Sequence, residues 1–333
     1  MIYRAEIDGL RALAVIPVIF FHAGFEYFGG GFVGVDVFFV ISGYLITTLL
    51  IEEIQTDGFS FVKFYERRIR RILPALFFVT SVCIPFAWMW MSPSQMKDFS
   101  QSLVALSLFS SNIFFWQKSD YFDPVSHENP LLHTWSLALE EQYYIFFPLV
   151  LYAVWRYGKN TVFWVLILFL MFSLFLSEWG WRSMATANFY LLPTRIWELL
   201  TGSLAALIVN KRGVQTNNFW STVGLIFIIF SIFSYDKLIP FPSLYTLLPV
   251  MGAMLLILFA EKKTVVGRIL SLKVLVGLGL ISYSAYLWHH PIFVFSRIRS
   301  AENLSLYFYL VLIFITFLLA FLSWKLIEQP FRK

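Results

Sequence analysis

The chain has 333 residues, of which 59% are hydrophobic, 20% aromatic and only 14% charged, and its mean hydropathy is +0.73. This composition excludes an ordinary soluble globular protein and indicates a polytopic membrane protein. The formal net charge of +5 does not indicate nucleic-acid binding, because the basic residues cluster in short stretches between apolar segments, where they set membrane topology.

Apolar segments recur along the whole chain, and no polar stretch between them is long enough to bury a separate core. Residues 1–333 are therefore expected to form a single all-α membrane domain. Segments that approach the length of about 20 residues needed for a spanning helix lie at 10–28, 31–52, 73–92, 134–155, 161–178, 191–209, 219–235, 244–260, 272–296 and 304–327. Another segment, 101–117, is short and polar at SLFSSN. If it does not cross, the basic loops fit about ten transmembrane helices with both termini cytoplasmic, plus one non-spanning helix.

The first apolar segment contains two ionisable residues, Arg11 and His22, eleven positions apart. At about 100° per residue they lie within roughly 20° of each other on one helix face, separated by roughly 16 Å along the axis. Ionisable groups at membrane depth are costly and usually face a protein interior or a wet cavity. Both residues are therefore candidate catalytic residues.

The second segment, GGGFVGVDVFFVISGYLI, places a carboxylate, Asp36, after four glycines. If this helix packs against the first one, Asp36 is positioned to orient or charge-pair with His22, as carboxylates do for catalytic imidazoles. The alternative is a helix cap or an interhelical hydrogen bond. The glycines permit a tight turn and close helix approach.

Four arginines within five residues follow the second segment, in a stretch, ERRIRRILP, that is predicted to be a cytoplasmic loop. Arginine binds phosphate bidentately and stays charged, so the cluster suits a polyphosphorylated ligand such as a nucleotide or coenzyme A. A basic loop that only anchors the spans to anionic lipid is an equal alternative. The candidate cofactor-binding residues are Arg67, Arg68 and Arg71.

The segment LLHTWSLALEEQYYIFFP carries polar residues at the start of an apolar helix. Two adjacent acids there are unusual and indicate an acceptor-binding or structural network. The candidate substrate-binding residues in it are His133, Trp135, Glu140 and Glu141. Further along, Arg195 and Glu198 stand three residues apart and are expected to form a mainly structural pair.

The segment SYSAYLWHHPIF adds Trp288 and His289 as candidate substrate-binding residues. Its aromatic side chains suit either a membrane-interface belt or the floor of a sugar site. No metal is expected, because the histidines lack a tight H-x-x-x-H spacing and an acidic ligand set.

Together these strings resemble the membrane acyltransferase-3 family, which includes bacterial O-antigen and exopolysaccharide O-acetyltransferases. The resemblance extends over essentially the whole chain. It rests on IDGLRALAV, GGGFVGVDVFFVISGYLIT, FYERRIRRILPA, LLHTWSLALEEQYYIFFP, TRIWELLTG, ISYSAYLWHHPI and KLIEQPFRK.

The resemblance implies a ten-helix protein of the bacterial inner membrane, surrounded by membrane lipids. It implies transfer of an acyl group, usually acetyl, from cytosolic acetyl-CoA to a carbohydrate such as lipid-linked O-antigen of lipopolysaccharide or another surface polysaccharide. His22 corresponds to the family's catalytic residue, as base or transient acyl carrier, and Arg11 to its paired arginine. Arg68 and Arg71 correspond to the cytoplasmic arginine motif.

Some family members carry an additional extracytoplasmic hydrolase-like domain, and this chain is expected to be a standalone member because it stops at EQPFRK. The alternative function is a transporter or flippase for a lipid-linked saccharide, in which charged and aromatic residues line a passage without covalent chemistry. The sequence shows no convincing internal repeat of the kind such transporters carry, and it does not indicate an oligomeric state.

Overall fold

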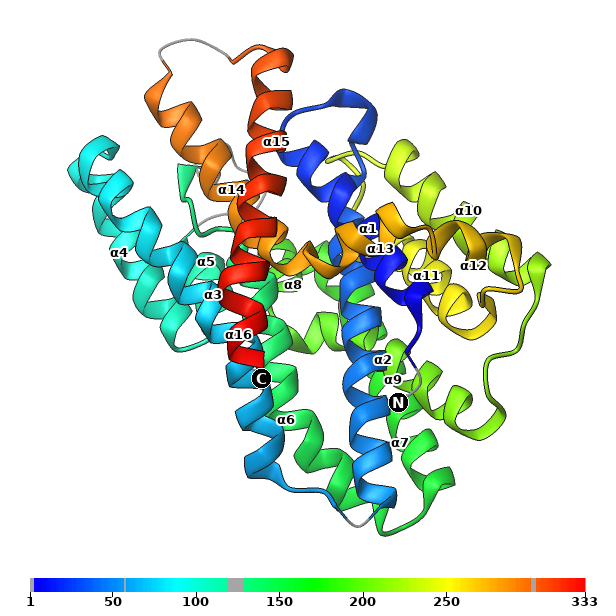
Figure 1. Cartoon of the computed structure of the whole chain (residues 1–333). Coiled ribbons are helices and arrows are strands. Elements are labelled where there is room, and N and C mark those ends of the chain that lie inside the picture. The colour runs from blue at the N-terminus through cyan, green and yellow to red at the C-terminus, as the bar shows by residue number, and fades with distance from the viewer. Residues whose placement is uncertain (1–2, 57, 119–127, 301–303, 333) are drawn as a thin grey trace.

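The computed structural model describes residues 3–56, 58–118, 128–300 and 304–332, and all secondary structure in these ranges is helical (Figure 1). This confirms the predicted all-α class. The longer helices are α1 (Ala5–His22), α2 (Gly34–Gln55), α3 (Phe61–Trp90), α4 (Pro93–Ser107), α6 (Thr134–Trp155), α7 (Lys159–Ser183), α9 (Leu192–Arg212), α10 (Asn218–Ser234), α11 (Leu247–Phe259), α14 (Ser282–Arg299) and α15 (Leu306–Ser323). The short helices are α5 (Ser111–Lys118), α8 (Ala185–Tyr190), α12 (Val265–Leu270), α13 (Lys273–Leu280) and α16 (Gln329–Arg332). Single helical turns occur at Glu26–Phe28, Gly31–Val33, Leu244–Thr246 and Trp324–Glu328.

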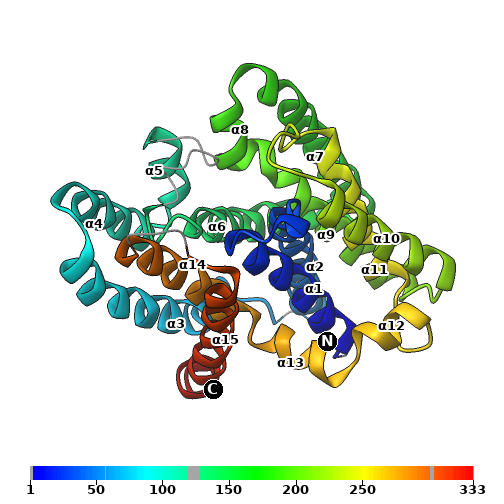
Figure 2. The ribbon, with the colours of Figure 1, turned by 90° about the horizontal axis from the view of Figure 1, so that it is seen from above.

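Several helical stretches are long and apolar enough to cross a membrane, which identifies a multi-pass membrane protein. Within the described residues they are Gly31–Gln55, Phe61–Trp90, Lys159–Ser183, Ala185–Arg212 and Leu306–Arg332. Helices α10 and α11 are apolar but shorter. Seen from above (Figure 2), α1 lies near the middle of the bundle, with α3 and α4 on one side and α10 and α11 on the other.

Helix α3 corrects one prediction, because the arginine-rich stretch expected to be a loop is helical. The helix begins at Phe61 and runs for 30 residues, so the arginines form its first turns. The Ser60 side chain caps it by accepting a hydrogen bond from the Lys63 backbone N–H. Since arginine has a high helix propensity, the basic stretch and the apolar stretch that follows it form one helix.

The predicted span 272–296 is also wrong, because it forms two helices, α13 and α14, that meet at Ile281. Helix α13 lies across the long axis of the bundle, against α1 (Figure 1). A Cβ atom on Gly279 would lie 1.8 Å from the Asp8 carbonyl oxygen, so only glycine permits this approach. The predicted non-spanning segment 101–117 forms parts of α4 and α5, which are 15 and 8 residues long and thus shorter than a membrane span.

The close helix approach predicted from the glycines of the second segment is confirmed between α1 and α2. A Cβ atom on Gly34 would lie 2.1 Å from the Ala14 carbonyl oxygen. One on Gly31, in the turn before α2, would lie 2.2 Å from the Pro17 carbonyl oxygen. The absence of side chains at both positions therefore lets α2 and its leading turn pack directly on α1.

Helices α2 and α9 contact each other at two reciprocal glycines. A Cβ atom on Gly43 would lie 1.9 Å from the Leu199 carbonyl oxygen, and one on Gly202 would lie 1.9 Å from the Val40 carbonyl oxygen. Next to this contact Thr47 donates a hydrogen bond of 2.8 Å to Ser203. Small residues at a helix interface allow backbones to pack closely, as membrane bundles require.

We expect Gly43→Ala to lower the stability of the protein, because its methyl group forces α2 and α9 apart, at a cost of about 1–3 kcal/mol. The matched control is Gly277→Ala on α13, where nothing lies within 4 Å of the new Cβ atom. Alanine at this helical position should leave stability unchanged or raise it by up to about 1 kcal/mol. Thermal unfolding of the detergent-purified variants measures both effects, and an equal response of the two would contradict this packing.

Candidate functional site

A cavity of about 850 Å³, including its open mouth, lies between α1, α2, α3, α6 and α14. Three guanidinium groups line it, from Arg11, Arg68 and Arg71, together with the carboxyl group of Glu140. The other lining residues are mostly apolar or hydroxyl-bearing: Val35, Phe38, Ile41, Ser42, Leu45, Ile46, Ile72, Ser136, Leu137, Tyr144, Ser282, Tyr283 and Tyr286. The cavity thus combines three cationic groups with a lining that is otherwise mostly apolar or hydroxyl-bearing.

The arginine cluster of α3 divides between the cavity and the outside of the protein. Arg68 and Arg71 line the cavity, where Arg11 from α1 joins them. Arg67 instead pairs with Glu53 at 2.5 Å, and the exposed Arg70 pairs with Glu66 at 2.8 Å. Of the three predicted cofactor-binding arginines, two line the cavity, and Arg67 is not among the lining residues.

The two adjacent glutamates of α6 have different surroundings. Glu140 lines the cavity and accepts a hydrogen bond of 2.8 Å from the Tyr144 hydroxyl group. Glu141 is buried, and its Oε1 atom makes no hydrogen bond within the described part of the chain. Both carboxyl groups lie close enough to the arginines to interact with them electrostatically. Both acids of α6 therefore lie beside the arginines of the cavity.

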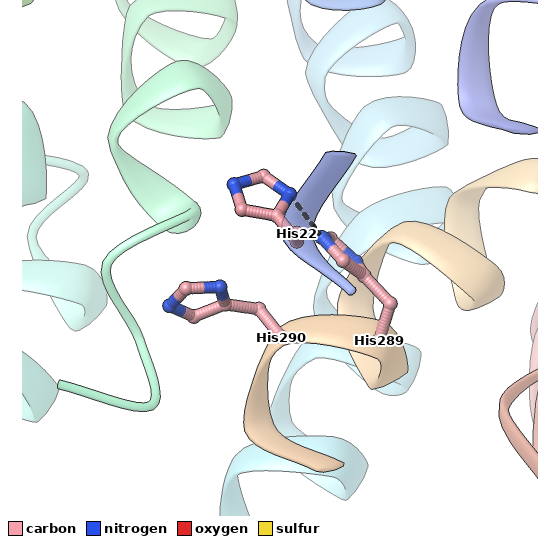
Figure 3. A group of neighbouring side chains, drawn as sticks. All are labelled: His22, His289 and His290. Carbon is pink, nitrogen blue, oxygen red and sulfur yellow. Dashed lines mark hydrogen bonds between the residues drawn. The ribbon is translucent and has the colours of Figure 1, made fainter. Parts of the chain in front are cut away.

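Four buried histidines from three segments gather into one group, which we call the histidine cluster: His22, His133, His289 and His290. His22 ends α1, His133 directly precedes α6, and the other two lie side by side on α14. The His22 ring lies 5.1 Å from the His289 ring and 5.2 Å from the His290 ring, measured between centroids (Figure 3). The chain has only five histidines, so the fold concentrates most of them at one point.

Backbone carbonyl groups define which nitrogens of the cluster carry protons. His289 Nδ1 donates to the Tyr286 carbonyl oxygen at 2.6 Å, so its Nε2 carries the lone pair. That Nε2 lies 3.2 Å from His22 Nδ1 (Figure 3), which also lies 3.0 Å from the Val18 carbonyl oxygen. With its proton on Nδ1, His22 carries its lone pair on Nε2 and is oriented by both neighbours.

Tyr286 and Ser136 form a wall shared by the cavity and the histidine cluster. Both residues line the cavity, and their hydroxyl groups lie 2.7 Å apart. The Tyr286 hydroxyl group also donates to the His133 carbonyl oxygen at 2.9 Å, and its ring centroid lies 5.2 Å from that of His289. One layer of side chains therefore separates the cationic cavity from the histidines.

Asp36 does not pair with His22 as expected. Its side chain accepts a hydrogen bond of 2.7 Å from Arg195 of α9, which also pairs with Glu198 at 3.1 Å. All three side chains are at most 1% exposed. The close contact of α2 with α9 directs Asp36 to this buried ion group, so the alternative of an interhelical hydrogen bond is confirmed, as is the Arg195–Glu198 pair.

The two predicted substrate-binding tryptophans lie outside the cavity lining. Trp135 packs on Phe189, with ring centroids 4.7 Å apart, and lies against the Arg195 guanidinium group. Trp288 donates a hydrogen bond of 2.8 Å to Ser323 of α15. In the structure these contacts join helices within the bundle.

Sequence reasoning missed Tyr286 and His290 as site residues. Tyr286 could have been found from helical periodicity, because Tyr286 and His289 are three residues apart and share a helix face. His290 precedes Pro291 and was visible only as half of a histidine pair. The linear spacing between the histidines carried no information, since their proximity arises from the packing of three segments.

Fold and site together define a multi-pass helical membrane protein in which a cationic cavity adjoins a buried histidine cluster. Residues 4–325 match the family model described as an acyltransferase domain, and the chain belongs to the membrane acyltransferase-3 family. No solved structure matches the chain.

Relatives with assigned names support this membership. The chain is 33% identical, over 352 residues, to the O-acetyltransferase OatA of Staphylococcus aureus strain NCTC 8325 / PS 47, covering 99% of this chain and 57% of that protein. It is 30% identical, over 355 residues, to the peptidoglycan O-acetyltransferase OatA of Listeria monocytogenes, covering 99% and 56%. It thus spans little more than half the length of these relatives.

We expect Arg195→Met to destabilise the protein by about 3–5 kcal/mol, because it leaves the Asp36 and Glu198 carboxyl groups buried without their cation. Arg182→Met is the matched control, since it breaks an i,i+4 pair with Glu178 in which the arginine side chain is 54% exposed. Its effect should stay below about 1 kcal/mol. Thermal unfolding and the yield of monodisperse protein report the difference, and similar values for both variants would refute a supporting role for the ion group.

Proposed function

We propose that this protein transfers an acetyl group from cytosolic acetyl-CoA to a hydroxyl group of a cell-surface carbohydrate at the bacterial cytoplasmic membrane. The family membership and the O-acetyltransferase names of its relatives support the reaction type. They also weigh against the alternative of a transporter or flippase without covalent chemistry. The observation that carries the proposal is the contact between the cationic cavity and the histidine cluster.

The arginines of the cavity suit the phosphate groups of coenzyme A. Arg68 and Arg71 are positioned to bind its phosphate groups through bidentate, charge-assisted hydrogen bonds. The pantetheine arm then extends along the apolar lining toward Ser136 and Tyr286. Arg11 lies in the same lining, where its cation stabilises a phosphate or the developing charge on the thioester oxygen.

His22 is proposed as the catalytic residue, acting through the lone pair on Nε2. As a general base it removes the proton of the acceptor hydroxyl, whose oxygen attacks the thioester carbonyl carbon. The carbon–sulfur bond breaks, and the proton passes to the coenzyme A thiolate. As an acyl carrier, the same nitrogen attacks the thioester carbon first and expels the coenzyme A thiolate. The acceptor hydroxyl oxygen then takes the acetyl group from the nitrogen, and the hydroxyl proton passes to the thiolate. Both routes need a neutral imidazole and movement of the wall between cavity and cluster.

His289 is proposed as the positioning residue for His22, in the place first assigned to Asp36. Its Nε2 atom lies 3.2 Å from His22 Nδ1, and its own Nδ1–H is held by the Tyr286 carbonyl oxygen. An acceptor at Nδ1 stabilises positive charge on the His22 ring as it develops. An uncharged imidazole performs this role without placing a carboxylate in the apolar interior.

The acceptor is proposed to be a carbohydrate polymer. The resemblance stated for the sequence includes O-antigen O-acetyltransferases, whereas the Listeria relative is named for peptidoglycan. We favour a peptidoglycan glycan as the first acceptor to test, with lipopolysaccharide O-antigen as the second. Both supply hydroxyl groups on the outer side of the membrane, so the chemistry at His22 is the same.

His22→Gln should abolish acetyl transfer, with a loss of at least about 100-fold, because glutamine cannot accept the proton or carry the acyl group. The measurement is transfer of labelled acetyl from acetyl-CoA to the glycan acceptor in membranes with equal amounts of protein. The exposed Gln55→Ala serves as control and should retain transfer. Normal turnover by His22→Gln would move the search for the catalytic group to Glu141 and His289.

Arg68→Gln combined with Arg71→Gln should raise the KM for acetyl-CoA, because each loss of a charged hydrogen bond costs about 1.5–3 kcal/mol, or roughly tenfold or more in affinity. Arg70→Gln is the matched control on the same helix, since Arg70 is exposed and lies outside the cavity lining. Steady-state kinetics at varied acetyl-CoA distinguishes them. If the double variant and Arg70→Gln changed the KM equally, the arginines of α3 would contact lipid or set topology rather than bind acetyl-CoA.

A further inference from the structure

We infer that the histidine cluster is a binding site for a divalent transition metal ion of the zinc class. His22, His289 and His290 each offer a ring nitrogen, and these three atoms lie within 4.8 Å of one another (Figure 3). All three residues are buried. The sequence predicts no metal because the histidines lack a tight spacing along the chain and an acidic ligand set, but close spacing in sequence is not needed for ligands that α1 and α14 bring together.

The closest pair of nitrogens already has the separation that a shared metal ion requires. His289 Nε2 and His22 Nδ1 are 3.2 Å apart. With zinc–nitrogen bonds of about 2.0–2.1 Å, two ligands at this separation subtend roughly 100° at the ion, close to the tetrahedral angle. The ion then replaces the proton at His22 Nδ1, which moves to Nε2 or leaves. His290 reaches the same ion after a side-chain shift on the order of 1 Å.

Outer hydrogen bonds orient two of the ligands as metal sites commonly do. A ligating histidine usually donates its other ring N–H to a carbonyl or carboxylate, which fixes the ring and its tautomer. His289 Nδ1 does so with the Tyr286 carbonyl oxygen at 2.6 Å, and His290 Nε2 with the Asn129 carbonyl oxygen at 3.2 Å. The remaining nitrogens, Nε2 of His289 and Nδ1 of His290, therefore carry lone pairs.

Several nitrogens of the cluster lack hydrogen bonds, although they are buried. His290 Nδ1 and both ring nitrogens of His133 make none within the part of the chain that the structure describes. A buried polar atom without a partner destabilises the folded protein. A metal ion satisfies such lone pairs, and the His133 ring, 5.2 Å from that of His290 between centroids, is placed to supply a fourth ligand.

The donor set selects the class of ion. Imidazole nitrogens suit zinc, copper or nickel, whereas calcium and magnesium need oxygen ligands. The Arg297 guanidinium group donates to the His22 carbonyl oxygen at 3.4 Å, so a cation here is opposed by a positive neighbour. Strong bonds between a transition metal ion and imidazole nitrogens offset this repulsion. The weak contacts of imidazole with calcium or magnesium do not offset it.

This site does not depend on acetyl transfer, but it affects how transfer proceeds. Metal binding removes the His22 proton from Nδ1 and replaces the contact with His289 that positions the ring. Bound zinc is therefore expected to compete with the proposed role of His22 rather than to assist it. The binding and the transfer are measured separately, so either proposal can fail alone.

The test is zinc binding by the full chain, purified with a tag that contains no histidine. The protein is incubated with zinc chloride, desalted and measured by elemental analysis, and the zinc environment is read by X-ray absorption. We expect about one zinc ion per chain with at least three imidazole ligands and no sulfur. His290→Gln should lose most of this zinc, whereas Cys83→Ala, which removes the sole thiol, should retain it.

Absence of zinc from the wild-type chain after desalting would overturn the proposal, and so would sulfur in its absorption spectrum. If His290→Gln fails to fold, the wild-type absorption spectrum still tests the proposal. His289→Gln is a second variant that should also lose most of the zinc. Incubation with calcium should leave no bound ion. Absence of acetyl transfer by zinc-free protein would refute only the proposed function, and acetyl transfer by a chain that binds no zinc would refute only the metal site.

Discussion

The buried ion group of Asp36, Arg195 and Glu198 is the constraint on which the rest of the arrangement depends. Uncompensated charge is expensive in an apolar interior, so α2 and α9 must remain in register for these side chains to satisfy one another. The glycines at the same interface make this possible by letting the backbones meet. Charge pairing and close packing thus fix one pair of helices against which α1 and α6 are placed.

The two parts of the candidate site arise from this arrangement. Helix α2 supplies one side of the cavity, and α1 spans from Arg11 in that cavity to His22 in the histidine cluster. Helix α14 contributes to both, because Tyr286 lines the cavity while His289 contacts His22. The same short stretch of α14 therefore connects the cationic cavity with the histidine cluster.

Much of this was predictable from sequence, and the failures have physical causes. Arg11 and His22 were selected as candidates because they are ionisable residues in an apolar segment. Burying such a group in a membrane costs free energy, so it usually has a function. The partner of Asp36 was not predictable, because it depends on which helices pack together. The arginine-rich stretch was wrongly predicted to be a loop, and it lies in helix α3. Positive charge indicates the side of the membrane on which a stretch lies, but it does not indicate whether that stretch is helical. The gathering of histidines at residues 22, 133, 289 and 290 required the tertiary fold.

The proposed function requires that an acyl-CoA bound at the α3 arginines presents its acyl group to His22. A structure of the protein with a non-hydrolysable acetyl-CoA analogue, determined by electron cryomicroscopy in lipid nanodiscs, tests this most directly. We expect phosphate density at Arg68 and Arg71, with the thioester mimic at the wall formed by Ser136 and Tyr286 and directed toward His22. Phosphates bound elsewhere, or an acyl group directed away from the histidine cluster, would contradict it.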